Sequence, residues 1–247
     1  MTALPAAWAD LADAFPNLSL GRRLKGIAEL AGGAAVFTTS FGLEDQAITH
    51  AIAETGADIR IATIDTGRLF GETHDVWAET EARYGRRIEA WYPDTAAVEA
   101  LVAEQGANGF RASVEARHAC CHVRKVAPLA RILATATVWV TGLRAGQSAV
   151  RRGARFIEAD AAHGVIKVNP LLDWDRDRLV STVALEGIAY NALHDHGFPS
   201  IGCQPCTRAV RLGEDERAGR WWWEADAKRE CGLHFNHAAA GTASAVA

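Results

Sequence analysis

The stretch that decides the fold is AAVFTTSFGLEDQAITHAIAETGADIRIATIDT, residues 34–66. Two short apolar runs rich in β-branched residues, 34–40 and 59–66, flank a segment with helical spacing at 44–54. A strand, a helix and a second strand at this spacing predict a parallel β-α-β unit. The stretch therefore favours an α/β fold over an all-helical or all-β fold.

The same alternation continues on both sides of this stretch. Further helices are expected at 21–31, 72–84, 95–105 (capped by Asp94–Thr95) and 114–134, and further strands at 87–93 and 137–142. Beyond residue 153 the pattern changes to a hairpin, RFIEAD and VIKVNPLL around His163–Gly164, and a capped helix at 175–187. We therefore expect an open, mainly parallel sheet with helices on both faces and an irregular C-terminal segment.

Three polar turns mark the expected ligand site. SFGLED (40–45), DTGRLFGE (65–72) and TGLRAGQS (141–148) each follow a predicted strand. In open parallel sheets, ligands bind beyond the carboxyl ends of the strands, where such turns meet. The sequence thus predicts one crevice lined by these three loops.

Composition narrows the class of protein. The chain has 247 residues, a formal net charge of −4 and a pI near 6.1, which argues against broad nucleic-acid binding. The N-terminus lacks the pattern of a secretory signal, and no run approaches the ~18 apolar residues of a membrane span. We expect a cytoplasmic protein without membrane or nucleic-acid partners, folded as a single domain over 1–237, with 238–247 disordered.

Five cysteines carry the clearest chemical signal. Cys120 and Cys121 are adjacent, Cys203 and Cys206 form a CxxC, and Cys231 stands alone. Reduced thiols in the cytoplasm favour metal or redox chemistry over disulfides. The two pairs suit zinc or an iron–sulfur cluster, and adjacent cysteines favour 4Fe–4S because each can bind a different iron. The alternative is a pair of buried apolar thiols beside a thioredoxin-type CxxC.

Cys231 lies in Glu230-Cys231-Gly232-Leu233-His234. A nucleophilic thiolate needs a lowered pKa, which nearby cations can supply. Lys228, Arg229 and His234 are close in sequence. Taken alone, a single cysteine near a C-terminus is more often a residue without a special function.

Seven ordered segments resemble the assimilatory phosphoadenylyl-sulfate/adenylyl-sulfate reductase family. They are SFGLEDQ (40–46), IDTGRLFGETH (64–74), CCHVRK (120–125), TGLRAGQSAVR (141–151), GCQPCTRAV (202–210), GEDERAGRWWWE (213–224) and ECGLH (230–234). The resemblance implies the adenine-nucleotide α-hydrolase fold shared with ATP pyrophosphatases. Those enzymes use a Ser-Gly-Gly-x-Asp-Ser loop, which SFGLED replaces here, so an ATP pyrophosphatase is disfavoured.

The cysteines place the chain within that family. Members with CC and CxxC beside ECGLH resemble adenylyl-sulfate (APS) reductases with a 4Fe–4S cluster. The resemblance implies Cys120, Cys121, Cys203 and Cys206 as cluster ligands, and Cys231 as the nucleophile of a thioredoxin-dependent (or glutaredoxin-dependent) reaction that forms a Cys231 S-sulfonate. Reduction of the 3′-phosphorylated substrate, PAPS, and a non-catalytic nucleotide-binding iron–sulfur sensor remain alternatives.

Motif matching also assigns the substrate contacts. Lys125, Arg217, Arg220 and His234 are expected at the phosphosulfate, Gly142, Arg144 and Arg151 at the nucleotide, and Leu69 with the 65–67 turn at the adenine. The segment 200–237, poor in periodicity, is expected to be a mobile catalytic segment. The family resemblance further implies a homo-oligomer, with Trp221–Trp223 as a candidate contact. His194 and His196 have metal-like spacing but are interpreted as structural.

Overall fold

A six-stranded sheet organises the chain. The computed structural model describes residues 4–148 and 150–224. The strands are β1 (Ala35–Thr39), β2 (Arg60–Ile64), β3 (Glu89–Trp91), β4 (Val138–Val140), β5 (Ile157–Asp160) and β6 (Val165–Val168), in the order β3-β2-β1-β4-β6-β5. All neighbours are parallel except β5 and β6, which form the predicted antiparallel hairpin. The expectation of an open, mainly parallel sheet is confirmed.

The chain reverses its direction of travel across the sheet beside β1. It runs from β1 through β2 to β3 on one side and then returns to place β4 on the other side of β1. The turns that follow β1 and β4 therefore diverge and leave a crevice between them. This topological switch point is where the first and third predicted loops meet.

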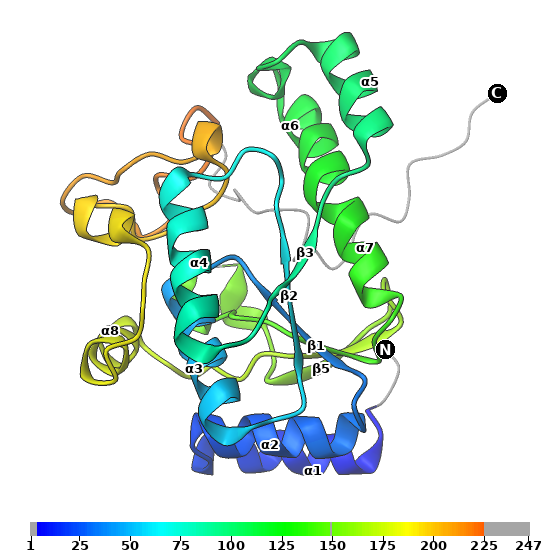
Figure 1. Ribbon diagram of the computed structural model, residues 1–247, viewed down its shortest axis with the longest axis vertical. Coiled ribbons are helices and arrows are strands. Elements are labelled where there is room, and N and C mark those ends of the chain that lie inside the picture. The colour runs from blue at the N-terminus through cyan, green and yellow to red at the C-terminus, as the bar shows by residue number, and fades with distance from the viewer. Residues whose placement is uncertain (1–3, 149, 225–247) are drawn as a thin grey trace.

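Both faces of the sheet are covered. Along β1, Ala35 and Phe37 belong to one buried cluster, whereas Val36 belongs to another. The first cluster is packed against α1 (Ala6–Ala14), α2 (Leu20–Ala31), α3 (Leu43–Thr55), α4 (Gly71–Tyr84) and α8 (Arg176–Leu185), and the second against α7 (Ala127–Leu133). Figure 1 shows α3 and α4 on one side of the strands and α7 on the other. Helix α5 (Thr95–Gln105) begins at the predicted cap, where Asp94 accepts from the Ala97 amide at 2.9 Å.

The predicted continuous helix over 114–134 is interrupted. It consists of α6 (Val114–Cys121), a π-helical turn (His122–Val126) and α7. Pro128, the second residue after the turn, has no amide hydrogen to donate back into it, which favours a widened turn over a regular one. Such π-turns are frequent at functional sites, and this one carries Lys125.

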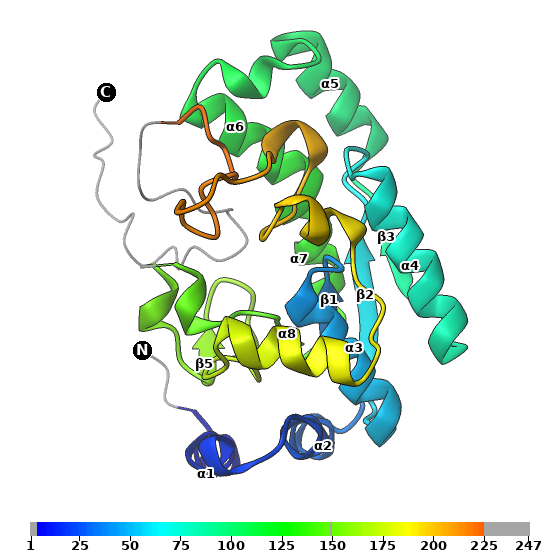
Figure 2. The same ribbon diagram turned by 90° about the vertical axis from the view of Figure 1, so that its left-hand side faces the viewer.

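The segment 200–224 has little regular structure. It contains a short 3₁₀ turn at Gln204–Cys206 and an isolated bridge between Thr207 and Arg220. Figures 1 and 2 both place this orange segment near α6. Cys231, His234 and the predicted disordered end at 238–247 lie outside the described residues. None of the helices within the described ranges is long and apolar enough to cross a membrane.

Candidate active site

A cleft opens at the carboxyl ends of β1, β2 and β4. Each of the three predicted turns contributes to its wall, and the segment after α8 closes its far side. The lining from the three turns comprises Ser40, Phe41, Gly42, Glu44, Asp45, Thr66, Leu69, Thr141, Gly142, Leu143 and Gln147. The sheet topology therefore brings together the loops that the sequence pattern singled out.

The loop after β1 is held in an uncommon conformation. Phe41 has a left-handed backbone (φ 60°) and is almost fully buried, with its ring stacked on Trp77 at a centroid distance of 5.5 Å. The amide and hydroxyl of Ser40 donate to the Asp45 carboxylate at 2.6 and 2.8 Å. A strained non-glycine residue persists only where its surroundings fix it. Here the aromatic stack and the carboxylate fix the start of α3, where Gly42, Glu44 and Asp45 line the cleft.

Asp45 is buried beneath this loop and against the turn after β4. Burial raises the pKa of its carboxyl to about 6, although the bonds from Ser40 act in the opposite direction. A Cβ at Gly142 would lie 2.1 Å from Asp45 Oδ1. The turn after β4 comes so close to Asp45 that only glycine fits at position 142. This close approach explains the glycine of the TGLR turn.

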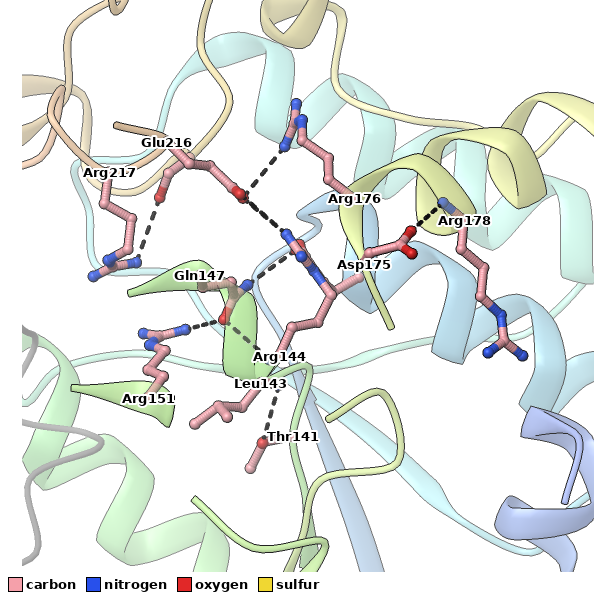
Figure 3. A network of polar contacts seen from close by, with 12 residues as sticks. Thr141, Leu143, Arg144, Gln147, Arg151, Asp175, Arg176, Arg178, Glu216 and Arg217 are labelled. Atoms are coloured by element: carbon pink, nitrogen blue, oxygen red, sulfur yellow. Dashed lines mark hydrogen bonds and ion pairs between the residues drawn. The ribbon is translucent and has the colours of Figure 1, made fainter. Parts of the chain in front are cut away.

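Arg144 connects three parts of the site. It is buried, and its guanidinium donates to Glu44 at 2.7 Å and to Glu216 at 2.9 Å. Figure 3 shows it between Gln147 and Glu216, with Arg176 on the other side of Glu216 at 3.2 Å. Arg144 does not line the cleft. Its geometry is that of a positioning residue that joins α3, the turn after β4 and the segment 200–224.

Most of the other predicted substrate contacts do line the cleft. They are Leu69, Lys125, Gly142, Arg151, Arg217 and Arg220. Arg151 is buried and bonded to Gln147, and the Arg220 guanidinium packs so closely over Gly202 that a Cβ there would lie 2.2 Å away. Asp65, by contrast, accepts from the amide of Gly67 at 2.8 Å and thus closes its own turn. In the part of the chain that the structure describes, four cationic side chains line the cleft against three carboxylates, Glu44, Asp45 and Glu216, and the cations fit a phosphorylated anion.

The four described cysteines line a second pocket next to the cleft. Cys120 and Cys121 reach it from the end of α6, and Cys203 and Cys206 from the segment 200–224. Phe110 and Trp221 pack with Cys203 and Cys206 in one buried cluster. Five cationic side chains of the described segments also line the pocket: Arg68, Arg117, Arg124, Lys125 and Arg220. The Thr66 hydroxyl lies 3.3 Å from Cys203 Sγ, in hydrogen-bond contact. The structure thus brings together four thiols that are up to 86 positions apart (206 − 120).

The pocket offers a sulfur-only set of donors. Among the described residues, no three His, Cys, Asp or Glu side chains converge as one tetrahedral ion requires. Burial and then Cys203 raise the pKa of the Cys206 thiol to about 11, whereas Lys125 and Arg220 act in the opposite direction. The donor set consists of four soft sulfurs beside cationic side chains, which suits a multi-iron cluster because each iron takes only one thiolate.

Lys125 and Arg220 are shared by the two pockets. Both line the nucleotide-sized cleft, and both line the cysteine pocket. Lys125 comes from the π-turn and Arg220 from the segment 200–224, so neither pocket is built from one element. An anion in the cleft and a sulfur site in the second pocket would contact the same two cations.

Motif matching identified Lys125 and Arg220, but it did not identify the residues that hold the segment 200–224 in place. Arg117 and Glu224, both buried, form a two-pronged ion pair at 2.8 and 2.9 Å. Arg117 and Arg220 each lie 4.7 Å from the Trp221 ring centroid, and Trp221 itself has a left-handed backbone (φ 44°). The partners are 107 positions apart, so local sequence patterns could not predict the pair. The only sign of Glu224 in the sequence was its place at the end of the GEDERAGRWWWE segment. Trp222 and Trp223 are half-buried.

Comparisons with known proteins agree with this architecture. Residues 34–209 match the model of the phosphoadenosine phosphosulfate reductase domain. The chain is 56% identical over 229 residues to an adenosine 5′-phosphosulfate reductase of Sinorhizobium fredii (strain USDA 257), covering 93% of this chain and 91% of that protein.

Two solved structures share the fold. A phosphoadenylyl-sulfate reductase from Candida auris superposes with a TM-score of 0.70 at 24% identity, over 85% of this chain and 99% of that one. Yeast FAD synthetase gives a TM-score of 0.53 at 14% identity, over 85% of this chain and 70% of that one. These neighbours confirm the expected adenine-nucleotide α-hydrolase type of fold.

Proposed function

The chain belongs to the phosphoadenosine phosphosulfate reductase family, and on that premise we propose that it reduces adenylyl sulfate (APS) to sulfite and AMP. It is an oxidoreductase of sulfate assimilation, like the adenosine 5′-phosphosulfate reductases that it resembles. The observation that carries the proposal is the wall of Lys125 and Arg220 between the cleft and the four-cysteine pocket. Lys125 and Arg220 thus contact both the anion-binding cleft and the pocket of the four cysteines.

The cleft supplies binding and charge neutralisation. The adenosine would lie along the carboxyl edge of β1, β2 and β4, near Leu69 and Gly142. The phosphosulfate would lie toward Lys125, Arg217 and Arg220, whose charges stabilise the AMP oxyanion as it leaves. In this arrangement the cations act on the leaving group, and the nucleophile comes from elsewhere in the chain.

The nucleophile proposed is the Cys231 thiolate. Its sulfur attacks the sulfur of APS, the S–O bond to AMP breaks, and the enzyme holds a Cys231 S-sulfonate. A thiol of reduced thioredoxin, or of a glutaredoxin-like protein, then attacks Cys231 Sγ and releases sulfite. The second thiol of that protein resolves the mixed disulfide, so that two electrons pass from a dithiol to sulfur and Cys231 is regenerated. The segment 200–237 would close for attack and open for the reductant.

The four cysteines fit a 4Fe–4S cluster. Cys120, Cys121, Cys203 and Cys206 offer one thiolate to each iron, and the cationic side chains that line the same pocket would balance the negative charge of the thiolates. When bound, such a cluster would contribute fixed negative charge and structural cross-linking beside the shared cations. Thr66 would donate to Cys203, and Lys125 with Arg220 would balance the thiolates.

Turnover by anaerobically purified protein tests the reaction. With thioredoxin and a thiol source, sulfite and AMP should form from APS, and PAPS should not be consumed at a comparable rate. Cys231→Ser should release no sulfite while binding AMP as the wild type does, because the cleft is intact. Release of adenosine 3′,5′-bisphosphate from PAPS at the higher rate would show that the phosphorylated substrate is the natural one.

Iron content tests the cofactor separately. The wild type should be brown with four irons per chain, and Cys121→Ser and Cys206→Ser should each lose iron and colour. A colourless protein with one zinc would refute the cluster. Sedimentation of the same samples tests the predicted homo-oligomer, which a single monomeric species would contradict.

A further inference from the structure

His194 is a cleft residue that the proposed chemistry does not use. It lies in the 3₁₀ turn Ala192–His196 and lines the cleft, whereas His196 in the same turn is exposed and does not. The two-residue spacing resembled a metal motif. The structure separates the two histidines and leaves His194 alone beside the nucleotide site.

One hydrogen bond fixes the tautomer of His194. Its Nδ1 lies 2.8 Å from the carbonyl oxygen of Phe198, and a carbonyl only accepts. Nδ1 therefore carries the proton, and in the neutral ring Nε2 is an acceptor. Burial lowers the pKa of His194, which keeps the ring neutral near pH 7.

Nε2 is buried and has no partner among the described residues. A buried acceptor without a donor costs about 1–3 kcal/mol, so such an atom beside a cleft indicates a ligand donor. The charged groups that act on the ring are Glu44, Arg176 and Asp195, of which two are carboxylates. Arg176 is itself paired with Glu216. A phosphate oxygen at this position would be repelled by the Nε2 lone pair and by the two carboxylates. An N–H or O–H group of the ligand would instead donate a hydrogen bond to Nε2.

We propose that His194 is a nucleoside-reading residue, whose unprotonated Nε2 accepts a hydrogen bond from a hydroxyl or amino group of the bound nucleotide. This inference rests on the proposed function, because it takes the occupant of the cleft to be an adenine nucleotide. The donor is one of three: the ribose 2′-hydroxyl, the ribose 3′-hydroxyl or the 6-amino group of adenine.

Two conservative variants separate this role from a structural one. Asparagine places its amide N–H near Nδ1 and keeps the bond to Phe198, but it has no atom at Nε2. Glutamine reaches the Nε2 position with an acceptor and loses the Phe198 bond. If His194 reads the ligand, His194→Asn should weaken AMP binding about tenfold to hundredfold, and His194→Gln should weaken it much less. A structural role predicts the opposite order, and His196→Asn is the matched control with unchanged affinity.

Nucleotide analogues identify the donor. Calorimetry would compare AMP with 2′-deoxy-AMP, 3′-deoxy-AMP and purine riboside 5′-monophosphate, in the wild type and in His194→Asn. One analogue should lose affinity in the wild type but bind the variant as AMP does, because the deleted donor has already lost its acceptor. If all three ratios are the same in both proteins, the inference is wrong.

Measurements of AMP binding and of APS turnover separate the role of His194 from the proposed reaction. A wild type that reduces APS while His194→Asn binds AMP normally would overturn the inference alone. A wild type that binds AMP with the expected coupling but leaves APS intact would overturn the proposed reaction alone. A wild type that does not bind AMP would overturn both.

Discussion

The nucleotide cleft and the cysteine pocket are neighbours, but they are built in different ways. The cleft is formed at the edge of a sheet by three turns that directly follow strands, so its geometry follows from the topology. The cysteine pocket joins the end of α6 to a segment with little regular structure, held there by Arg117 and Glu224. The first is a property of the fold, and the second depends on a few long-range contacts.

This difference predicts that the cysteine pocket can be disrupted while the cleft stays intact. Glu224→Gln removes the carboxylate that pairs with the buried Arg117 guanidinium, which should cost about 3–5 kcal/mol of unfolding free energy. Iron content should fall with it, whereas AMP affinity should change by less than about threefold. Thermal unfolding, iron analysis and calorimetry measure the three effects.

The control for that variant is Glu89→Gln. Glu89 pairs with Arg60 at the partly exposed edge of the sheet, where such pairs are worth about 0–1 kcal/mol. A Glu224→Gln protein that melted like this control would contradict the idea that the buried pair holds the pocket.

The second prediction concerns pH and the cleft. The folded pKa of Asp45, about 6, lies above its ordinary value of 3.8, so the folded state keeps a proton that the unfolded chain releases. The stability of the wild type relative to Asp45→Asn should therefore fall by up to about 3 kcal/mol as pH rises from about 4 to 6. Denaturant titrations across this range measure it. Parallel pH curves for the two proteins would contradict a raised pKa of Asp45 in the folded state.

The third prediction tests the close approach in the cleft. Gly142→Ala places a methyl group against the Asp45 carboxylate, which should cost about 1–3 kcal/mol and weaken AMP binding. Gly153→Ala is the matched control, because a Cβ there has no atom within 4 Å and should change stability by less than about 0.5 kcal/mol. Equal melting temperatures for the two variants would argue against the predicted contact.

The fourth and smallest effect is expected at the shared wall. Lys125→Met should raise KM for APS about tenfold by removing a charge from the anion site, and it should also shift the absorption spectrum of the cysteine site. Lys25→Met, on the exposed face of α2, is the control. A variant that changed only one of the two readouts would show that the wall is not shared in function.

The same difference explains what the sequence could predict. The strands at 34–40 and 59–66, the hairpin after residue 153 and the three turns follow from local patterns, and the structure confirms them. The π-turn was not predicted, because a single widened turn barely disturbs helical periodicity. Motif matching assigned Arg144 to the nucleotide site but did not predict its ion-pair partners, because Glu44 and Glu216 are 100 and 72 positions away in the sequence.

Cys231 takes the sulfonate from APS beside the shared cations in the mechanism we propose. The intact mass of anaerobic protein, after incubation with APS and without any reductant, tests this step. We expect a gain of one SO₃ group, located on Cys231 by peptide mapping, absent from Cys231→Ser and removed by thioredoxin with release of sulfite. An unmodified chain that nevertheless turns over APS, or an adduct on another cysteine, would contradict it.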